Sequence, residues 1–436
     1  MQTRAWRFVG FAAVLGLAAC GSDDSGPRKE KPTAPAENDP SYTVTGVEPW
    51  YVIDNAATTV DQTMTAFVTA PDGTDDVDAY VADLPAQRLT KQPDGRFALQ
   101  LSVEDVPAGA QQVLFSANGD TTAFAAMPFN RSQPYYVLVT TDWDFSDPGV
   151  SAIHYEDELH QFHPEIRITH FVGPYTFTDP VVTPERQQEL VTWLLAQQAD
   201  HDDEIALHIH PYCNFVEDAG VTCITDQSTV YTTDASGYTI KLGAYSHQDV
   251  STLFAHAKTL FTQHGLPAPR TFRAGGWTAT LDTITALSEQ GFISDSSPLN
   301  WARIEEWQGK ELYRWCMENW NPIGDTSQPY YPSTSNVLAS GDSDLPILEL
   351  PDNGVMIDYV SLQEMNGIFD ANWNGTDTMD APRTLTMGFH PSTTFSQAEY
   401  DRVNHFLEYA DMHLASKHDG PVVYITMSDI VAAYPP

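Results

Sequence analysis

The sequence predicts an α/β protein whose main domain is built on a mostly parallel sheet, closed or nearly so, and is preceded by a small β-sandwich. Three observations support this. After Gln133-Pro134, short apolar strands alternate with amphipathic helices, the pattern of repeated β-α units. Between residues 41 and 130, apolar residues instead alternate with polar ones, as in half-buried strands. A chain of 436 residues, 42% of them hydrophobic, is long enough for two such domains.

The N-terminal residues are expected to lie outside both domains. Arg4 and Arg7 precede an apolar run that is too short to span a bilayer and has the length of a signal-peptide core. The run ends in Leu17-Ala18-Ala19-Cys20, which resembles the lipobox of bacterial lipoproteins. This resemblance implies cleavage before Cys20 and acylation of its thiol, so residues 1–19 are predicted to be a lipoprotein signal peptide. Residues 20–40, rich in Ser, Asp, Pro, Lys and Glu, are predicted to be a disordered tether.

If Cys20 is lipidated, we expect the protein to lie at the cell envelope, attached to the membrane only through its lipid. Gly21 and Ser22 follow the cysteine instead of an acidic residue, which favours the outer membrane, the cell surface or the periplasm. The formal net charge of -38 repels nucleic acid, so no nucleic-acid partner is expected. We expect the chain to be a monomer.

Residues 41–130 are predicted to form a small immunoglobulin-like β domain that acts as a spacer or touches glycan. Met64 to Ala70 and Arg96 to Val103 alternate apolar and polar residues. Val113 to Ala117 and Thr122 to Ala126 flank Asn118-Gly119, which is a signal for a type I′ hairpin turn.

Residues 131–436 are predicted to form the parallel-sheet domain. The expected strands are 136–142, 165–172, 204–210, 270–273, 291–295 and 422–427, and the expected helices are 153–162, one introduced by Thr183-Pro184, 248–264, 278–290 and 396–417. The last helix opens with a capping box formed by Ser396 and Glu399.

Candidate catalytic side chains follow two of these strands. Asp142 and Asp144 stand one residue apart at the end of the first strand, and His208 and His210 are spaced in the same way at the end of a later one. Side chains two residues apart in a strand share a face, so each pair projects from one side. In a parallel barrel such strand ends converge at the C-terminal rim. Carboxylates and imidazoles together suit one divalent metal ion, with Zn expected first and Co, Ni or Mn as alternatives.

The cysteines predict a covalently closed loop beside these histidines. Cys213 and Cys223 lie close together and are expected to form a disulfide in an oxidising compartment, whereas Cys316 is left over and expected to be buried. The segment 213–245 departs from the strand end that carries the two histidines, and we predict that it forms a disulfide-stapled lid over the metal site.

Three further stretches fall on strand ends of the same domain: Thr271 to Trp277, Gly291 to Ser297 and Met387 to Pro391. With the Asp and His motifs, their order resembles that of the polysaccharide deacetylases, the NodB-homology or carbohydrate esterase family 4 superfamily. The resemblance covers about 133–430. It implies a distorted (β/α)7 barrel that holds one divalent metal and removes acetyl groups from N-acetylated sugars.

Carried over to this chain, the resemblance makes Asp142 the general base and Asp144 and His208 metal ligands. It makes Arg273 the residue that orients the base and His390 the general acid. The family places its second metal histidine four residues after the first, where this chain has Tyr212. Two candidates for that ligand stay open: His210, on the strand face of His208, and His247, whose following residues are similar to the segment after the family's second histidine.

The leading functional hypothesis is a metal-dependent hydrolase that removes acetyl groups from carbohydrate at the bacterial cell envelope, with N-acetylated sugars expected first and O-acetylated sugars left open as an alternative. Its expected substrate is an acetylated polysaccharide or peptidoglycan. The alternative is a catalytically degenerate barrel that serves as a glycan-binding surface lipoprotein.

Overall fold

The computed structural model describes residues 30–304 and 307–436. The predicted signal peptide and the lipidation site Cys20 lie outside the described residues. Within the described part, no helix combines the length and the apolar character needed to cross a bilayer.

The larger part of the molecule is built on one parallel sheet, in agreement with the predicted α/β class. Its nine strands are β10 (Tyr135–Asp142), β11 (Ile168–Val172), β12 (Glu204–Ile209), β13 (Thr271–Ala274), β14 (Ser294–Asp295), β15 (Leu348–Glu349), β16 (Val355–Met356), β17 (Arg383–Phe389) and β18 (Val422–Tyr424). Their order is β15-β14-β13-β12-β11-β10-β17-β16, and β18 pairs with the first half of β10. Every pairing in this sheet is parallel.

The sheet is curled, and a short segment of chain joins the strands at its two ends. Strands β15 and β16 lie at opposite ends of the order, yet the chain runs directly from one to the other through residues 350–354. Such a short connection spans at most about 20 Å, because an extended residue covers about 3.4 Å. The sheet therefore curls into a half-barrel, whose parallel strands end at one rim.

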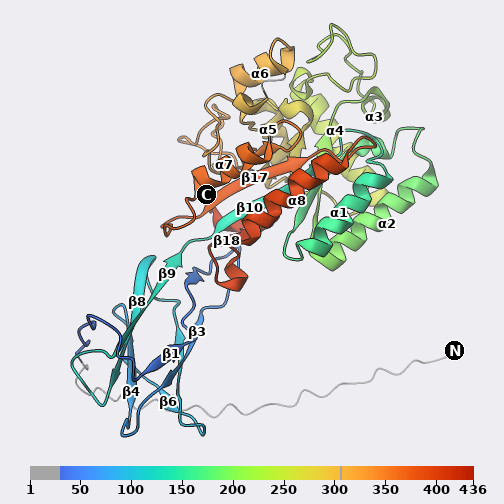
Figure 1. Ribbon diagram of the computed structural model, residues 1–436. Coiled ribbons are helices and arrows are strands. Elements are labelled where there is room, and N and C mark those ends of the chain that lie inside the picture. Colours follow the sequence, from blue (N-terminus) through green and yellow to red (C-terminus); the bar gives the residue numbers. More distant parts are fainter. Residues whose placement is uncertain (1–29, 305–306) are drawn as a thin grey trace, which may run out of the picture.

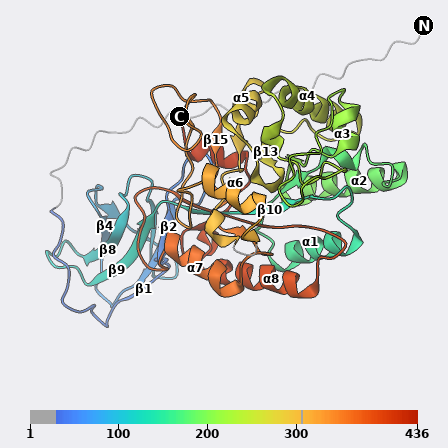
Figure 2. The same cartoon turned by 90° about the horizontal axis from the view of Figure 1, so that it is seen from above.

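In the described residues, eight α-helices lie around this sheet (Figure 2). They are α1 (Val150–Phe162), α2 (Pro184–His201), α3 (Cys213–Asp218), α4 (His247–Gln263), α5 (Leu281–Glu289), α6 (Glu311–Asn319), α7 (Leu362–Asn372) and α8 (Gln397–Asp411). Figure 1 shows α1 and α8 side by side along β10, where the rings of Tyr155 and Tyr400 stack with centroids 4.9 Å apart. The predicted capping box of Ser396 and Glu399 begins α8.

The alternation of side chains along β10 explains how this strand places Asp142 in the candidate site. Tyr135, Val137 and Val139 point outward and pack under the helices. Tyr136 and Leu138 belong to a separate cluster inside the barrel. Because side chains alternate faces along a strand, Asp142 continues this inner row and lies at the rim.

The N-terminal part forms two facing sheets around one apolar core. One contains β1 (Thr43–Thr45), β3 (Thr63–Thr69), β7 (Phe97–Ser102) and β6 (Thr90–Lys91), and the other contains β2 (Trp50–Val52), β9 (Ala125–Ser132), β8 (Gly109–Ala117), β4 (Val77–Val81) and β5 (Gln87–Arg88). Asn118 and Gly119 both have positive φ, at 51° and 79°, as a type I′ turn requires. The immunoglobulin-like assignment of this domain stays a prediction.

The predicted tether needs a correction at its C-terminal end. Thr33 pairs with Thr122 of the β domain, and the backbone N–H of Asp39 donates to the carbonyl of Phe124 at 2.8 Å. Backbone hydrogen bonds bind this polar segment to the domain, and composition alone does not reveal them.

Two predicted helices are shorter than expected. Helix α5 begins at Leu281 instead of 278, because Gly276 and Trp277 adopt positive φ and Thr280 caps the helix by accepting from the N–H of Thr283. Helix α8 ends at Asp411, and residues 415–417 form a separate 3₁₀ turn. Helices α3, α6 and α7 were not predicted.

A buried charged cluster joins α1 to the sheet. His170 of β11 lies 2.9 Å from a carboxylate oxygen of Asp203 and 3.2 Å from one of Glu156. All three side chains are buried. Burial opposes a charge on His170, but the two carboxylates outweigh it and raise the pKa of His170 to about 9.

We expect His170→Gln to lower the free energy of unfolding by about 3 to 5 kcal/mol, because it leaves the buried Glu156 without its cation and leaves Asp203 with His160 as its remaining imidazole partner. The folded-state pKa lies above the usual 6.5, so this stabilisation is fully present below pH 6.5 and is lost as the pH rises through about 9. Urea unfolding of both proteins at about pH 6 and about pH 10 tests it. An equal difference at both pH values would contradict the charged state of His170.

Candidate metal centre

Asp144, His208 and His210 meet at the C-terminal rim of the barrel. The Oδ1 atom of Asp144 lies 3.2 Å from Nε2 of His208 and 3.1 Å from Nε2 of His210. One ligand atom from each residue falls within 4.8 Å of the other two, a spacing that a single metal ion can bridge. His208 lies on β12, His210 follows directly after that strand, and Asp144 lies two residues after the end of β10.

The hydrogen bonds of the two imidazoles show which atoms are left to bind a cation. Nδ1 of His208 lies 2.9 Å from the carbonyl oxygen of Arg273, and Nδ1 of His210 lies 2.8 Å from that of Tyr238. A carbonyl oxygen only accepts, so both Nδ1 atoms carry the hydrogen. With Nδ1 engaged in this way, Nε2 is the ring atom that each histidine turns toward the carboxylate of Asp144 and could offer to a metal. Three acceptors facing one another repel unless a cation lies between them, so these residues fit a divalent metal.

The close packing around His210 depends on a glycine. A Cβ on Gly275 would lie 2.6 Å from Cγ of the His210 ring. The residue after Arg273-Ala274 must therefore lack a side chain, which explains the first glycine of the Gly-Gly pair, and the second, Gly276, has a φ of +58°.

The prediction that His247 could be the second metal histidine is wrong. It is the first residue of α4, its side chain is 40% exposed, and its Nε2 lies 2.9 Å from the carboxylate of Glu289. The insertion shifts the family-like segment along the sequence, but the barrel brings His210 to Asp144 instead.

Asp142 and Arg273 form a buried ion pair next to this cluster. Nη1 of Arg273 donates to Oδ1 of Asp142 at 2.9 Å and to the hydroxyl of Thr140 at 2.9 Å. Nη2 donates to the hydroxyl of Ser296 at 2.9 Å, and the guanidinium lies over the ring of Phe171. These contacts fix the arginine on several strands, so it holds Asp142 in one orientation.

His390 approaches the cluster from β17. Its Nδ1 lies 2.7 Å from a carboxylate oxygen of Asp358, and its Nε2 lies 3.8 Å from Oδ1 of Asp144. Burial disfavours the charged ring, but Asp144 and Asp358 outweigh it and raise the pKa of His390 to about 10. With Nδ1 held by Asp358, His390 turns its Nε2 toward the cavity and Asp144.

These residues line one cavity. Asp142, Asp144, His208, His210 and His390 share it with aromatic side chains. The aromatic lining residues are Tyr238, Trp277, Trp307 and Tyr359. A larger cavity, of about 660 Å³, lies between residues 57–61 and the opposite end of the barrel. None of the candidate residues lines that larger cavity, so we place the chemistry in the smaller one.

The remaining site predictions concern cysteines. The structure joins Cys213 and Cys223 in a disulfide, and Cys316 is a buried free cysteine.

Sequence reasoning missed two residues that complete the site. Asp358 holds His390, and Asp352 accepts a hydrogen bond from Nε1 of Trp277 at 2.8 Å. The signal for Asp358 was present: Val355-Met356-Ile357-Asp358 repeats the pattern of an apolar strand that ends in an aspartate.

No protein-family model matches the chain, and no curated protein matches it. Solved structures similar to it include a protein from Mycobacterium smegmatis described as a polysaccharide deacetylase, at 15% identity and a TM-score of 0.42, covering 69% of this chain and 90% of that one. The family 4 carbohydrate esterase from Streptomyces lividans in complex with acetate has 10% identity and a TM-score of 0.34, covering 69% and 96%. The Xyl-CE4 domain of a multidomain xylanase from the hindgut metagenome of Trinervitermes trinervoides has 10% identity and a TM-score of 0.34, covering 68% and 90%. At these values we base no functional argument on the likeness.

Proposed function

We propose that this chain is a metal-dependent hydrolase that removes acetyl groups from N-acetylated carbohydrate. One observation carries the proposal. The Asp144-His208-His210 cluster opens into the same cavity as an arginine-bound aspartate, Asp142, and a histidine held by a carboxylate, His390. A ligand set, a base and an acid in one cavity are the groups that hydrolysis of an amide requires.

Asp144, His208 and His210 would hold the metal. A divalent ion bound by three side chains lowers the pKa of a water molecule and polarises an acyl carbonyl. The expected ion is Zn, with Co, Ni or Mn as alternatives, because the donors are two imidazoles and one carboxylate.

Asp142 takes the proton of the attacking water. The ion pair with Arg273 holds its carboxylate in one orientation at the cavity. His390 then donates a proton to the departing amine nitrogen, while Asp358 holds the opposite ring nitrogen. An amine leaves poorly as an anion, so a positioned acid matters more for an amide than for an ester.

The location at the cell envelope is part of the proposal. The Leu17-Ala18-Ala19-Cys20 motif supports a lipid anchor there, and acetylated polysaccharide or peptidoglycan is the substrate class to expect in that place. Because base, acid and ligand positions are all filled, we prefer an active enzyme over a degenerate glycan-binding barrel.

A substrate panel tests this function. We expect the purified chain to release acetate from N-acetylglucosamine oligomers or peptidoglycan, and to lose this activity when a chelator removes the metal. An O-acetylated xylan in the same panel separates ester from amide cleavage. Binding of these glycans without any acetate release would favour the degenerate barrel.

A further inference from the structure

The insertion between β12 and α4 contributes a side chain to the candidate metal centre. We propose that Tyr238 is a positioning residue of that centre, which orients Asp144 through its hydroxyl and His210 through its backbone carbonyl. The inference rests on the proposed metal site and adds a residue from a segment that the family-like motifs do not include.

The hydroxyl contact fixes the carboxylate of Asp144. Oη of Tyr238 donates to Oδ2 of Asp144 at 2.7 Å. The other oxygen, Oδ1, is the one that faces both His208 and His210. With Oδ2 engaged by a donor, the carboxylate presents a single oxygen to the metal position in one orientation.

The carbonyl contact fixes the imidazole of His210. Nδ1 of His210 donates to the carbonyl oxygen of Tyr238 at 2.8 Å, which holds the tautomer and the ring angle. The ring of Tyr238 also packs against that of His210, with centroids 4.4 Å apart. One residue therefore supports two of the three ligands.

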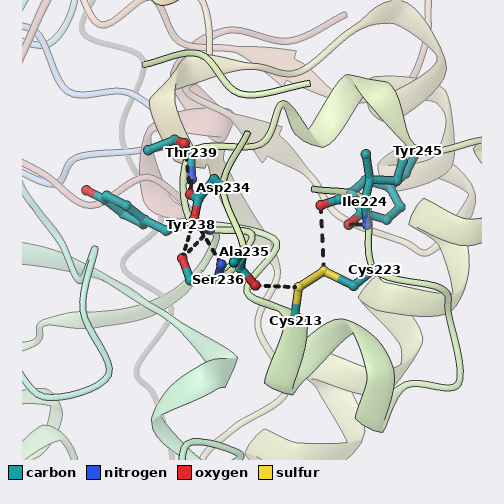
Figure 3. The surroundings of a disulfide bond; sticks show 9 residues. All are labelled: Cys213, Cys223, Ile224, Asp234, Ala235, Ser236, Tyr238, Thr239 and Tyr245. Carbon is teal, nitrogen blue, oxygen red and sulfur yellow. Dashed lines mark hydrogen bonds between the residues drawn. A yellow bond between two sulfur atoms is a disulfide. The ribbon is translucent and has the colours of Figure 1, made fainter. Parts of the chain in front are cut away.

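A rigid loop presents Tyr238 to the site. Oδ1 of Asp234 accepts from the N–H of Ser236 at 2.9 Å, and its Oδ2 accepts from the N–H of Thr239 at 2.7 Å. The N–H of Cys213 donates to the carbonyl of Ser236 at 2.8 Å, which ties the loop to the chain just after His210. Figure 3 shows Tyr238 pointing away from the disulfide of Cys213 and Cys223, with Ala235 and Ser236 between them.

Gly237 allows this close docking. Its φ is +83°, and a Cβ there would lie 2.3 Å from the carbonyl oxygen of Pro211. Any larger residue must push the loop off Pro211, and Tyr238 must move with it. The position therefore offers a second way to displace Tyr238 without changing the tyrosine itself.

The test measures Zn²⁺ affinity of the full chain by competition with a chromophoric chelator. We expect Tyr238→Phe to weaken Zn²⁺ binding about 10- to 100-fold, the usual effect of losing a partner of a metal ligand. The visible spectrum of the Co²⁺ form should also change, because the orientation of Asp144 changes the ligand field. Tyr231→Phe, on an exposed tyrosine of the same insertion, is the matched control and should leave both unchanged.

Gly237→Ala provides an independent variant and should weaken Zn²⁺ binding as well. If metal-free Tyr238→Phe does not fold, as judged by circular dichroism, the inference is decided by Gly237→Ala alone. Wild-type affinity and an unchanged Co²⁺ spectrum in a folded Tyr238→Phe overturn the inference while leaving the metal site intact. A wild-type chain that binds no Zn²⁺ instead overturns the proposed function.

Discussion

Asp144→Ala is expected to lower bound metal and acetate release together. Asp144 is the only anion of the three predicted ligands, and its Oδ1 lies within 3.2 Å of both imidazole Nε2 atoms. Its loss removes both a coordination position and the Coulomb attraction for a divalent ion. Metal content per chain and acetate release, measured on the same preparation, check this result.

The control for Asp144→Ala is Asp226→Asn, an exposed aspartate in the insertion, which should keep wild-type metal content and rate. Full metal occupancy in a folded Asp144→Ala would remove Asp144 from the ligand set.

Asp142→Asn is expected to leave metal occupancy near the wild-type value and to slow turnover by about 10² to 10⁴, the usual share of general-base catalysis. The amide oxygen of asparagine still accepts from Arg273, so the local hydrogen bonds survive. Asparagine, however, cannot take a proton from water. Metal content and turnover number distinguish this outcome from loss of a ligand.

The two aspartate variants are informative as a pair. Metal lost in Asp142→Asn and kept in Asp144→Ala would exchange their roles. No effect from either variant would place the reaction elsewhere in the molecule.

The sequence predicted the parts of the fold that depend on local patterns, such as the alternation of side chains along a strand or the capping residues of a helix. Strand β10 alternates its side chains between helix-packed and interior positions, and this places Asp142 at the rim. The same period of two brings His208 and His210 to one face of the β12 strand end. Local chemistry also predicted the Ser396–Glu399 capping box.

Contacts between distant segments were not predictable in this way. His247 follows residues that resemble the family's segment, but it begins α4 and pairs with Glu289. Tyr238 reaches Asp144 only because its loop docks on Pro211 and Cys213. Asp358 meets His390 because β16 and β17 are neighbours in the sheet. Each of these depends on tertiary packing and not on a sequence period.

The most direct test of this account is to return metal to the metal-free protein. Zn²⁺ is titrated into the chelator-treated wild-type chain while acetate release from N-acetylglucosamine oligomers is followed. We predict that activity is absent at the start, rises with added Zn²⁺ and reaches its plateau at one ion per chain, because one set of three ligands meets at the rim. Acetate release that persists without metal, or a chain that takes up no Zn²⁺, would contradict the account.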